Sequence, residues 1–364
     1  MVFYYLRHLT AKYMVNHERD EILNSNAILR TNQQIRDEYA AHEVINVLVL
    51  TGGGVRGLAP LRVLSRLEQL TGKSCGELFD FMAGTSTGAV NCGIMTVPDG
   101  NGGFLYSAQA LADNYYSDIR EMFYAPWYHQ FLTCFGLFGP RFLPEGKMNV
   151  LERYFQNTTL ADVKKNILVP VYDLAENSLN IIRNWEPARD GHYPNLLMRD
   201  VIHGASNPPV LFSPASFSIN GKKRVFIDPG VVVNNPAEIA LLNAWLMFPN
   251  KKIRLVLIGN GGEDALKYNH GHMAEFGIYG LLQYILNSPI ISSKLSTDMV
   301  LEYIHEAKDY GLDVEFRMIN SEGGHSLIAS DISESNMNRV EAFAEKMLQE
   351  HQDTLRELAV TLTS

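Results

Sequence analysis

The chain has 364 residues, a formal net charge of -9 and a pI near 5.7. Its apolar share of 46% and charged share of 20% exclude an intrinsically disordered chain and predict a sizeable buried core. The acidic balance argues against nucleic acid as a partner, and the length alone allows either one α/β domain or two domains.

Residues 1–42 are polar and mostly compatible with helix. Phe3, Leu6, Leu9 and Tyr13 would line one face of a short helix. We expect an N-terminal helical extension over residues 1–42 that packs on a main domain of residues 43–364. We prefer this interpretation to a membrane anchor.

Residues 45–50 form a β-rich apolar run, and leucines at helical spacing begin at Leu58. Between them lies the loop Thr51-Gly52-Gly53-Gly54-Val55-Arg56-Gly57, whose backbone N–H groups can converge on an anion. The pattern G-x-G-x-x-G also fits a dinucleotide pyrophosphate, but that reading needs an acidic residue at the end of the next strand. Because Asp80 stands at the start of that strand, we favour an oxyanion hole with the N–H groups around Gly53 and Gly54 as donors.

A second strand, loop and helix follows at residues 79–97. Its loop, Gly84-Thr85-Ser86-Thr87-Gly88, matches G-x-S-x-G, in which a sharp turn lifts a nucleophilic serine out of the sheet. A plain glycine-rich turn is the alternative. The strand before the motif and the helix after it favour Ser86 as a nucleophile.

Residues 122–143 depart from this alternation, because they combine many aromatic residues with proline and glycine breakers. The aromatic residues are Phe123, Tyr124, Trp127, Tyr128, Phe131, Phe135, Phe138 and Phe142. Such a segment is either a buried insertion or a partly exposed loop that meets lipid or covers an acyl-chain pocket. The sequence leaves both open.

Further strands are expected at residues 167–172, 179–183, 224–227, 253–258 and 314–319, mostly separated by helical stretches such as 236–248. Strands that alternate with helices indicate a largely parallel sheet covered on both faces.

A serine nucleophile needs a base within hydrogen-bonding reach. Asp228 follows the strand 224–227 and begins Asp228-Pro229-Gly230, at a strand end where α/β active sites collect. The alternative is a triad of Ser86, Asp228 and His325 in the chain order of α/β-hydrolases, but that fold places more strands before its serine turn.

Together these motifs make the chain resemble the patatin-like phospholipases, from about residue 45 onwards. The resemblance rests on the two glycine loops and on later segments: Gly139-Pro140-Arg141, Asp228-Pro229-Gly230, Asn234-Asn235-Pro236, Gly259-Asn260-Gly261 and the helix-like stretch 329–348. It implies a three-layer α/β/α sandwich and a Ser86-Asp228 dyad without histidine. The family's usual glycine after the aspartate is Pro229 here, which removes a backbone donor and fixes φ.

The resemblance implies a lipid acyl hydrolase of the phospholipase A or lysophospholipase type, acting through an acyl-enzyme. It requires neither cofactor nor metal. The expected partner is a phospholipid or other acyl lipid, with peripheral membrane contact through residues 122–143. The alternatives are the histidine-containing esterase and a silent binding, storage or effector protein.

Three cysteines, Cys75, Cys92 and Cys134, occur without a C-x-x-C pair, which indicates neither a disulfide framework nor a zinc site and fits a reducing compartment. Arg7, His8 and Lys12 interrupt the N-terminal apolar run, and no later segment reaches the roughly 18 apolar residues of a membrane span. We therefore expect a cytoplasmic protein, with export without a cleavable signal as the alternative.

Overall fold

The computed structural model describes residues 28–136, 138–185, 196–219, 222–261 and 293–364. The predicted helix of Phe3, Leu6, Leu9 and Tyr13 lies outside these residues. Within them, no helix combines the length and the apolar character that crossing a membrane requires.

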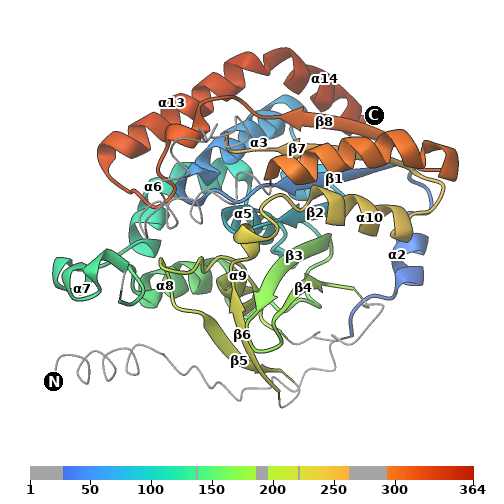
Figure 1. Ribbon diagram of the computed structural model, residues 1–364. Coiled ribbons are helices and arrows are strands. Elements are labelled where there is room, and N and C mark those ends of the chain that lie inside the picture. The colour runs from blue at the N-terminus through green and yellow to red at the C-terminus, as the bar shows by residue number, and fades with distance from the viewer. Residues whose placement is uncertain (1–27, 137, 186–195, 220–221, 262–292) are drawn as a thin grey trace, which may run out of the picture.

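The centre of the molecule is an eight-stranded sheet with the order β5-β6-β3-β2-β1-β7-β8, while β4 pairs with β3 beside this path (Figure 1). The strands are β1 Val44–Leu50, β2 Phe81–Gly84, β3 Asn166–Asp173, β4 Ser178–Arg183, β5 Ala215–Ile219, β6 Lys222–Ile227, β7 Lys252–Ile258 and β8 Val314–Ile319. Every strand expected from the sequence is present, and β5 is an addition.

Five neighbouring strands, β3, β2, β1, β7 and β8, run parallel. The prediction of a largely parallel sheet is therefore confirmed. The other strands, β4, β5 and β6, pair antiparallel. β6 is joined to β3 through only two residue pairs, Tyr172 with Ile227 and Asp173 with Phe226.

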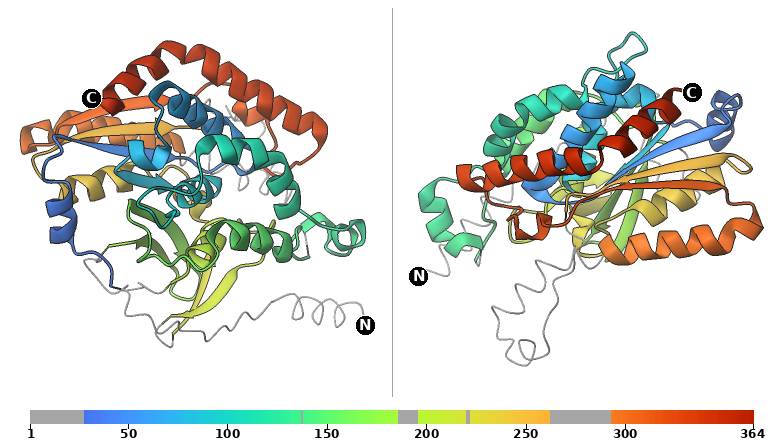
Figure 2. Two further views of the ribbon diagram at one scale, coloured as in Figure 1. Left: turned by 180° about the vertical axis from the view of Figure 1, so that it is seen from behind. Right: turned by 90° about the horizontal axis from the view of Figure 1, so that it is seen from above.

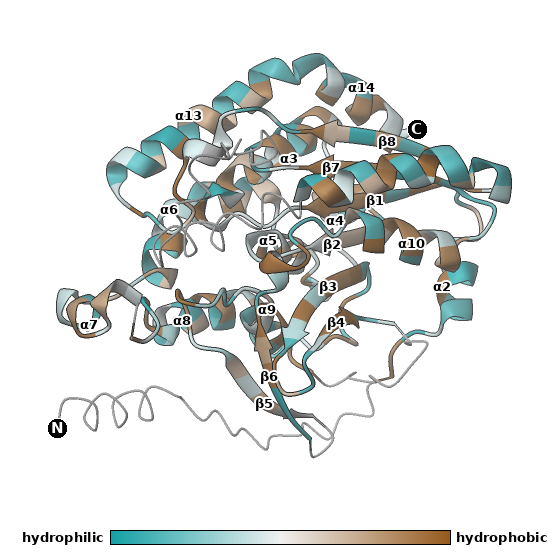
Figure 3. Cartoon of the chain, viewed as in Figure 1, coloured by the Kyte–Doolittle hydropathy of each residue, from teal (hydrophilic) through white to brown (hydrophobic). Residues whose placement is uncertain are grey.

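Helices cover both faces of the sheet (Figure 2). The side chains of β1 divide between two apolar clusters, because successive residues of a strand point to opposite faces. Leu48 and Leu50 join the cluster under α3 Leu58–Thr71, α6 Ala108–Met122, α8 Pro144–Phe155 and α13 Glu334–Glu350. Val47 and Val49 join the cluster under α2 Asn32–Glu38 and α10 Ala237–Met247. The strands between these layers are mainly hydrophobic (Figure 3).

The remaining helices are short or peripheral. They include α4 Cys75–Leu78, α5 Thr87–Met95, α7 Trp127–Leu132, α9 Met198–Ala205 and α14 Gln352–Thr363, and residues 293–306 are also helical. The 3-10 turns are η1 Gly54–Gly57, η2 Cys134–Gly136, η3 Pro229–Val231, η4 Ala307–Tyr310 and η5 Gly324–Ser326. These elements complete a three-layer α/β/α arrangement, as predicted.

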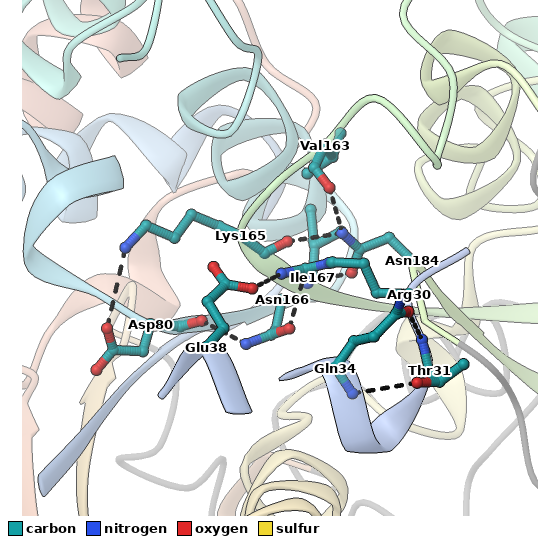
Figure 4. A network of polar contacts seen from close by, with 10 residues as sticks. All are labelled: Arg30, Thr31, Gln34, Glu38, Asp80, Val163, Lys165, Asn166, Ile167 and Asn184. Carbon is teal, nitrogen blue, oxygen red and sulfur yellow. Dashed lines mark hydrogen bonds and ion pairs between the residues drawn. The ribbon is translucent and has the colours of Figure 1, made fainter. Parts of the chain in front are cut away.

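The segment of the predicted extension that the structure describes packs at the amino ends of the strands (Figure 4). Arg30 donates hydrogen bonds to Glu38 at 2.8 Å and to Asn166 at 3.0 Å. Ile35 of α2 is fully buried. In the same network, Lys165 Nζ lies 3.9 Å from Oδ1 of Asp80, the residue just before β2. Residues 30–38 are thus attached to the sheet, while a domain boundary at residue 42 stays a prediction.

Candidate active site

Ser86 stands at the sharp turn between β2 and α5, half-buried, with φ 56° and ψ -125°. An L-residue adopts this backbone conformation only under strain, at a cost of about 1–3 kcal/mol. The turn is tight because a Cβ on Gly84 would lie 2.3 Å from the backbone of Gly88, and a Cβ on Gly88 would lie 2.4 Å from the Leu50 carbonyl. The two glycines of the motif are therefore required by packing, and they hold Ser86 at the carboxyl edge of the sheet.

Asp228 reaches the same edge from β6. It precedes η3, in which Pro229 takes the first helical position, where a missing N–H costs nothing. Its side chain accepts a hydrogen bond of 2.8 Å from the Gly230 amide, and its own amide donates to the Asn207 carbonyl at 3.1 Å. The proline that replaces the family's usual glycine is thus accommodated, and the carboxylate is oriented by Gly230.

Ser86 and Asp228, 142 residues apart in the sequence, line the same cavity, and the Ser86 hydroxyl interacts with the Asp228 carboxyl group. Asp228 is only 4% exposed. Burial raises the pKa of this carboxyl group to about 6, against the opposing effects of the Ser86 hydroxyl, the Gly230 amide and the charge of Lys147. A carboxylate with this pKa is mostly ionised at neutral pH and accepts a proton more readily than an ordinary aspartate.

The glycine loop lies against Ser86, since a Cβ on Gly52 would lie 3.1 Å from the Ser86 Cβ. Several of its amides already have partners: Gly52 donates to the Asn234 carbonyl at 3.0 Å, Val55 to Ala329 at 2.9 Å, and Arg56 to Gly53 at 3.2 Å. Among the described residues, the amides of Gly53 and Gly54 have no such acceptor. Of the six residues predicted for the oxyanion hole, these two have N–H groups left to offer an oxyanion.

Neighbouring loops hold this segment in place. The Asn234 amide donates to the Gly52 carbonyl at 3.2 Å, and the Asn260 amide donates to the Thr51 carbonyl at 3.2 Å. The hydroxyl of Tyr115 on α6 donates to the Gly54 carbonyl at 3.2 Å. Strand ends β1, β2, β6 and β7 therefore meet in one network around Ser86.

A cavity of about 720 Å³ opens beside Ser86 and Asp228. Most of its lining is apolar or aromatic: Leu61, Val90, Ile94, Leu111, Tyr115, Ile119, Met122, Phe123, Tyr154, Pro208, Pro209, Val210, Leu211, Phe212, Val231, Leu327, Ile328 and Ala329. Pockets of this size and character bind small, largely hydrophobic ligands. Among the described residues, no group of three or more histidine, cysteine, aspartate or glutamate side chains is placed to hold a metal ion.

The aromatic segment 122–143 is partly buried and partly exposed, and its contact with lipid stays a prediction. Phe123 and Phe142 are buried and pack against Phe212. Their ring centroids lie 5.4 Å and 5.6 Å from the ring centroid of Phe212. Trp127 and Phe131 of α7 are 80% and 72% exposed, and Tyr124, Tyr128, Leu132 and Phe138 are also exposed. α7 stands out from the body of the molecule next to the start of α8 (Figure 1).

Two further residues, His325 and Lys147, bear on the sequence predictions for the site. The backbone of His325 lies in η5, but its side chain is outside what the structure describes, so the alternative triad stays a hypothesis. Lys147 was not predicted, although it lines the cavity and is buried. A helical pattern with Lys147, Val150, Leu151 and Tyr154 on one face would have placed this lysine among buried residues.

Comparison with known proteins gives a consistent family assignment. A family model described as patatin-like phospholipase matches residues 48–241, more than half of the chain. Patatin-like protein 2 from Arabidopsis thaliana is 26% identical over 317 residues, which are 79% of this chain and 76% of that protein. Patatin-like protein 2 from Oryza sativa subsp. indica is 26% identical over 84% of each chain, and patatin group D-2 from Solanum tuberosum is 24% identical over 84% of each chain.

Among solved structures, the crystal structure of VipD from Legionella pneumophila aligns with 85% of this chain and 67% of that chain. The TM-score is 0.36 and the sequence identity is 13%.

Proposed function

The chain belongs to the patatin-like phospholipase family, whose members are lipid acyl hydrolases, and on this premise we propose that it cleaves fatty-acyl esters of phospholipids with Ser86 as nucleophile and Asp228 as base. The observation that carries the proposal is that Ser86, at its strained turn, and the buried Asp228 carboxylate face one cavity, where the Ser86 hydroxyl interacts with the carboxylate. The proposed reaction is of the phospholipase A type, and a lysophospholipid is an equally suitable substrate.

In the first half of the reaction, the Ser86 Oγ attacks the ester carbonyl carbon while its proton passes to Asp228. The resulting tetrahedral oxyanion accepts hydrogen bonds from the Gly53 and Gly54 amides. Collapse breaks the ester bond, and Asp228 returns the proton to the leaving alcohol oxygen. Water then attacks the acyl-enzyme, gives its proton to Asp228, and releases the fatty acid as the proton returns to Ser86.

The glycine amides favour the transition state over bound substrate, because full charge on the oxygen develops only as the tetrahedral species forms. The acyl chain lies in the apolar cavity, where each buried methylene contributes about 0.8 kcal/mol of binding. This environment also keeps Asp228 out of water and supports its raised pKa.

Such an enzyme must take its substrate from a lipid surface, and α7 supplies a suitable contact. Its exposed aromatic residues are of the kinds that settle at the membrane–water boundary. Residues 122–143 contain no aspartate or glutamate, although the chain as a whole carries a charge of -9. This segment can therefore approach a phospholipid headgroup layer with little repulsion, and Phe123 and Arg141 connect it to the cavity wall.

The dyad is tested with Ser86→Ala and Asp228→Asn in folded protein. We expect the first to reduce ester hydrolysis to background and the second to reduce kcat by about 100-fold to 10,000-fold, the usual contribution of a general base. His325→Ala should keep most of the activity. If His325→Ala is inactive and Asp228→Asn is active, the α/β-hydrolase triad replaces this mechanism.

A fluorophosphonate probe tests the silent alternative. The wild-type protein should be labelled at Ser86, whereas a storage or binding protein with an inactive site should not. Analysis of the fatty acids released from a panel of phospholipids, lysophospholipids and neutral acyl esters then identifies the substrate.

The lipid contact is tested with the double variant Trp127→Ala/Phe131→Ala and phosphatidylcholine vesicles. We expect at least tenfold weaker vesicle binding, since burial of each ring contributes about 1.5–3 kcal/mol. Hydrolysis of a soluble short-chain ester should not change. Tyr310→Ala is a matched control, because Tyr310 is also 80% exposed but lies before β8, at the amino end of the sheet. Equal vesicle binding by all three proteins would refute the contact.

A further inference from the structure

Lys147 is a buried cation at the wall of the active-site cavity. It lies in the first turn of α8 and is 3% exposed. It shares the buried face of the helix with Val150, Leu151 and Tyr154. A lysine is almost never fully buried without partners, because removing its charge from water is costly. Its position therefore calls for an explanation in terms of what its ammonium group contacts.

The ammonium group contacts the segment that carries the base. Its Nζ donates hydrogen bonds to the Ser206 carbonyl and, at 2.7 Å, to the side-chain oxygen of Asn207. The carbonyl of Asn207 in turn accepts the Asp228 amide at 3.1 Å. Nζ also lies 4.0 Å from the centroid of the Phe212 ring, a favourable cation–π contact. Lys147 is thus connected to Asp228 through a single intervening residue.

Lys147 and Asp228 also interact through their charges. Burial lowers the pKa of Lys147 to about 7, and the Asp228 carboxylate opposes this effect. Conversely, the Lys147 charge opposes the burial that raises the pKa of Asp228. Each group therefore favours the charged form of the other in a site from which water is largely excluded.

We propose that Lys147 is a positioning residue for the base: it fixes the 206–207 segment behind Asp228 and keeps the Asp228 carboxylate charged, ready to accept the Ser86 proton. This inference rests on the proposed dyad. It assigns to Lys147 a role in the proton transfer that requires no contact with the substrate.

The other ionisable groups near the base are already engaged or belong to different contacts. Arg56 of η1 donates to the carbonyls of Gly53 and Gly324. Asp118 of α6 pairs with Arg153 at 2.9 Å, and Asp173 of β3 pairs with Arg224 at 2.9 Å. The remaining groups are His203 of α9, which contacts Asn207, Arg141 in the cavity wall, and the phenols of Tyr115 and Tyr154. Among the cations of the described residues, Lys147 is the one whose charge lowers the pKa of Asp228.

The test is the pH dependence of kcat/KM for a soluble short-chain ester, measured on the full chain. Lys147→Met and Lys147→Gln both remove the charge, and the glutamine keeps a donor for the Ser206 carbonyl, which guards against a folding failure of the methionine variant. We expect the acid limb of both profiles to move to higher pH by about one unit or more, the usual effect of losing a nearby opposite charge. Lys147→Arg should return the acid limb to the wild-type position.

Lys165→Met is the matched control. Lys165 is also largely buried, with 18% of its side chain exposed, and it lies 3.9 Å from Asp80 at the opposite end of the strands. Its removal changes the net charge equally and should leave the acid limb in place. If the folded neutral variants at 147 lose activity at every pH with an unmoved acid limb, Lys147 is merely structural and the inference fails. If the wild-type protein hydrolyses no acyl ester, the proposed function itself has failed.

Discussion

Replacement of Gly54 by alanine tests whether the glycine loop acts through its exact backbone position. Gly54 has φ +58°, a region that costs an L-residue about 1–2 kcal/mol. An added Cβ would also lie 2.1 Å from the Ala329 carbonyl oxygen, which accepts the Val55 amide. A close C···O approach needs roughly 3.3 Å, so the loop and Ala329 must separate by about 1.2 Å.

A shift of that size moves the Gly53 and Gly54 amides away from the oxyanion. Misplacement by about 1 Å can reduce a rate 100-fold, and loss of one oxyanion donor reduces kcat by about 100-fold to 1,000-fold. We therefore expect Gly54→Ala to lower kcat by at least about 100-fold, with a smaller change in KM. Steady-state kinetics with a soluble acyl ester measure both constants.

Gly72→Ala separates this effect from backbone strain. Gly72 ends α3 with φ +70°, and a Cβ there would meet no atom within 4 Å. Both variants should lose similar stability from strain, but Gly72→Ala should keep the wild-type kcat. If Gly54→Ala retains a kcat within about threefold of Gly72→Ala, the two free amides do not form the oxyanion hole.

Three further results are expected. The kcat/KM of the wild-type enzyme should fall as the pH drops through about 6, because protonated Asp228 cannot accept the serine proton, and a profile that stays flat well below this pH contradicts that role. Burial acts to raise the pKa of Glu315, but hydrogen bonds from Arg254 and Lys252 hold this pKa at about 2. The ionised Glu315 side chain therefore stabilises the folded state fully above the ordinary pKa of 4.5, and this contribution is lost as the pH falls through about 2. Glu315→Gln should accordingly lower the free energy of unfolding by about 1–3 kcal/mol at neutral pH, with a deficit in urea titrations that disappears near that acid limit. Leu111→Trp adds a large side chain to the cavity and should shift the preferred acyl chain to a shorter one, whereas an unchanged chain-length profile would place the acyl group elsewhere.

Much of the architecture could be predicted because parallel strands buried on both faces form continuous apolar runs. β1 and β7 are examples, with sequences VINVLVL and KIRLVLI. β5 was missed because its sequence, ASFSI, alternates small polar with apolar residues and carries no such run. The antiparallel pairing of β5 and β6 was likewise not foreseen, because strand direction depends on connections that local periodicity does not report.

At the site, G-x-S-x-G and the glycine loop could be recognised since backbone geometry demands glycine at fixed spacings. The strand-end position of Asp228 made it a candidate base, but a direct pairing with Ser86 without histidine came from the family resemblance, because the two residues lie on distant strands. The sequence predicted donors around Gly53 and Gly54, but it could not show that the flanking amides of Gly52 and Val55 are taken up by Asn234 and Ala329, which are remote in sequence. Lys147 was overlooked because a lysine in a helix is usually solvated.

The two residues of the proposed dyad belong to different parts of the sheet. Ser86 follows a strand of the parallel core, whereas Asp228 follows β6, which with β5 forms a two-stranded ribbon joined to β3 by two residue pairs. Beyond these pairs, the Leu174 amide donates a hydrogen bond of 2.8 Å to the Val225 carbonyl, and Arg224 Nη1 lies 2.9 Å from Asp173 Oδ2. The position of the Asp228 carboxylate relative to Ser86 therefore depends on these few contacts between the ribbon and β3.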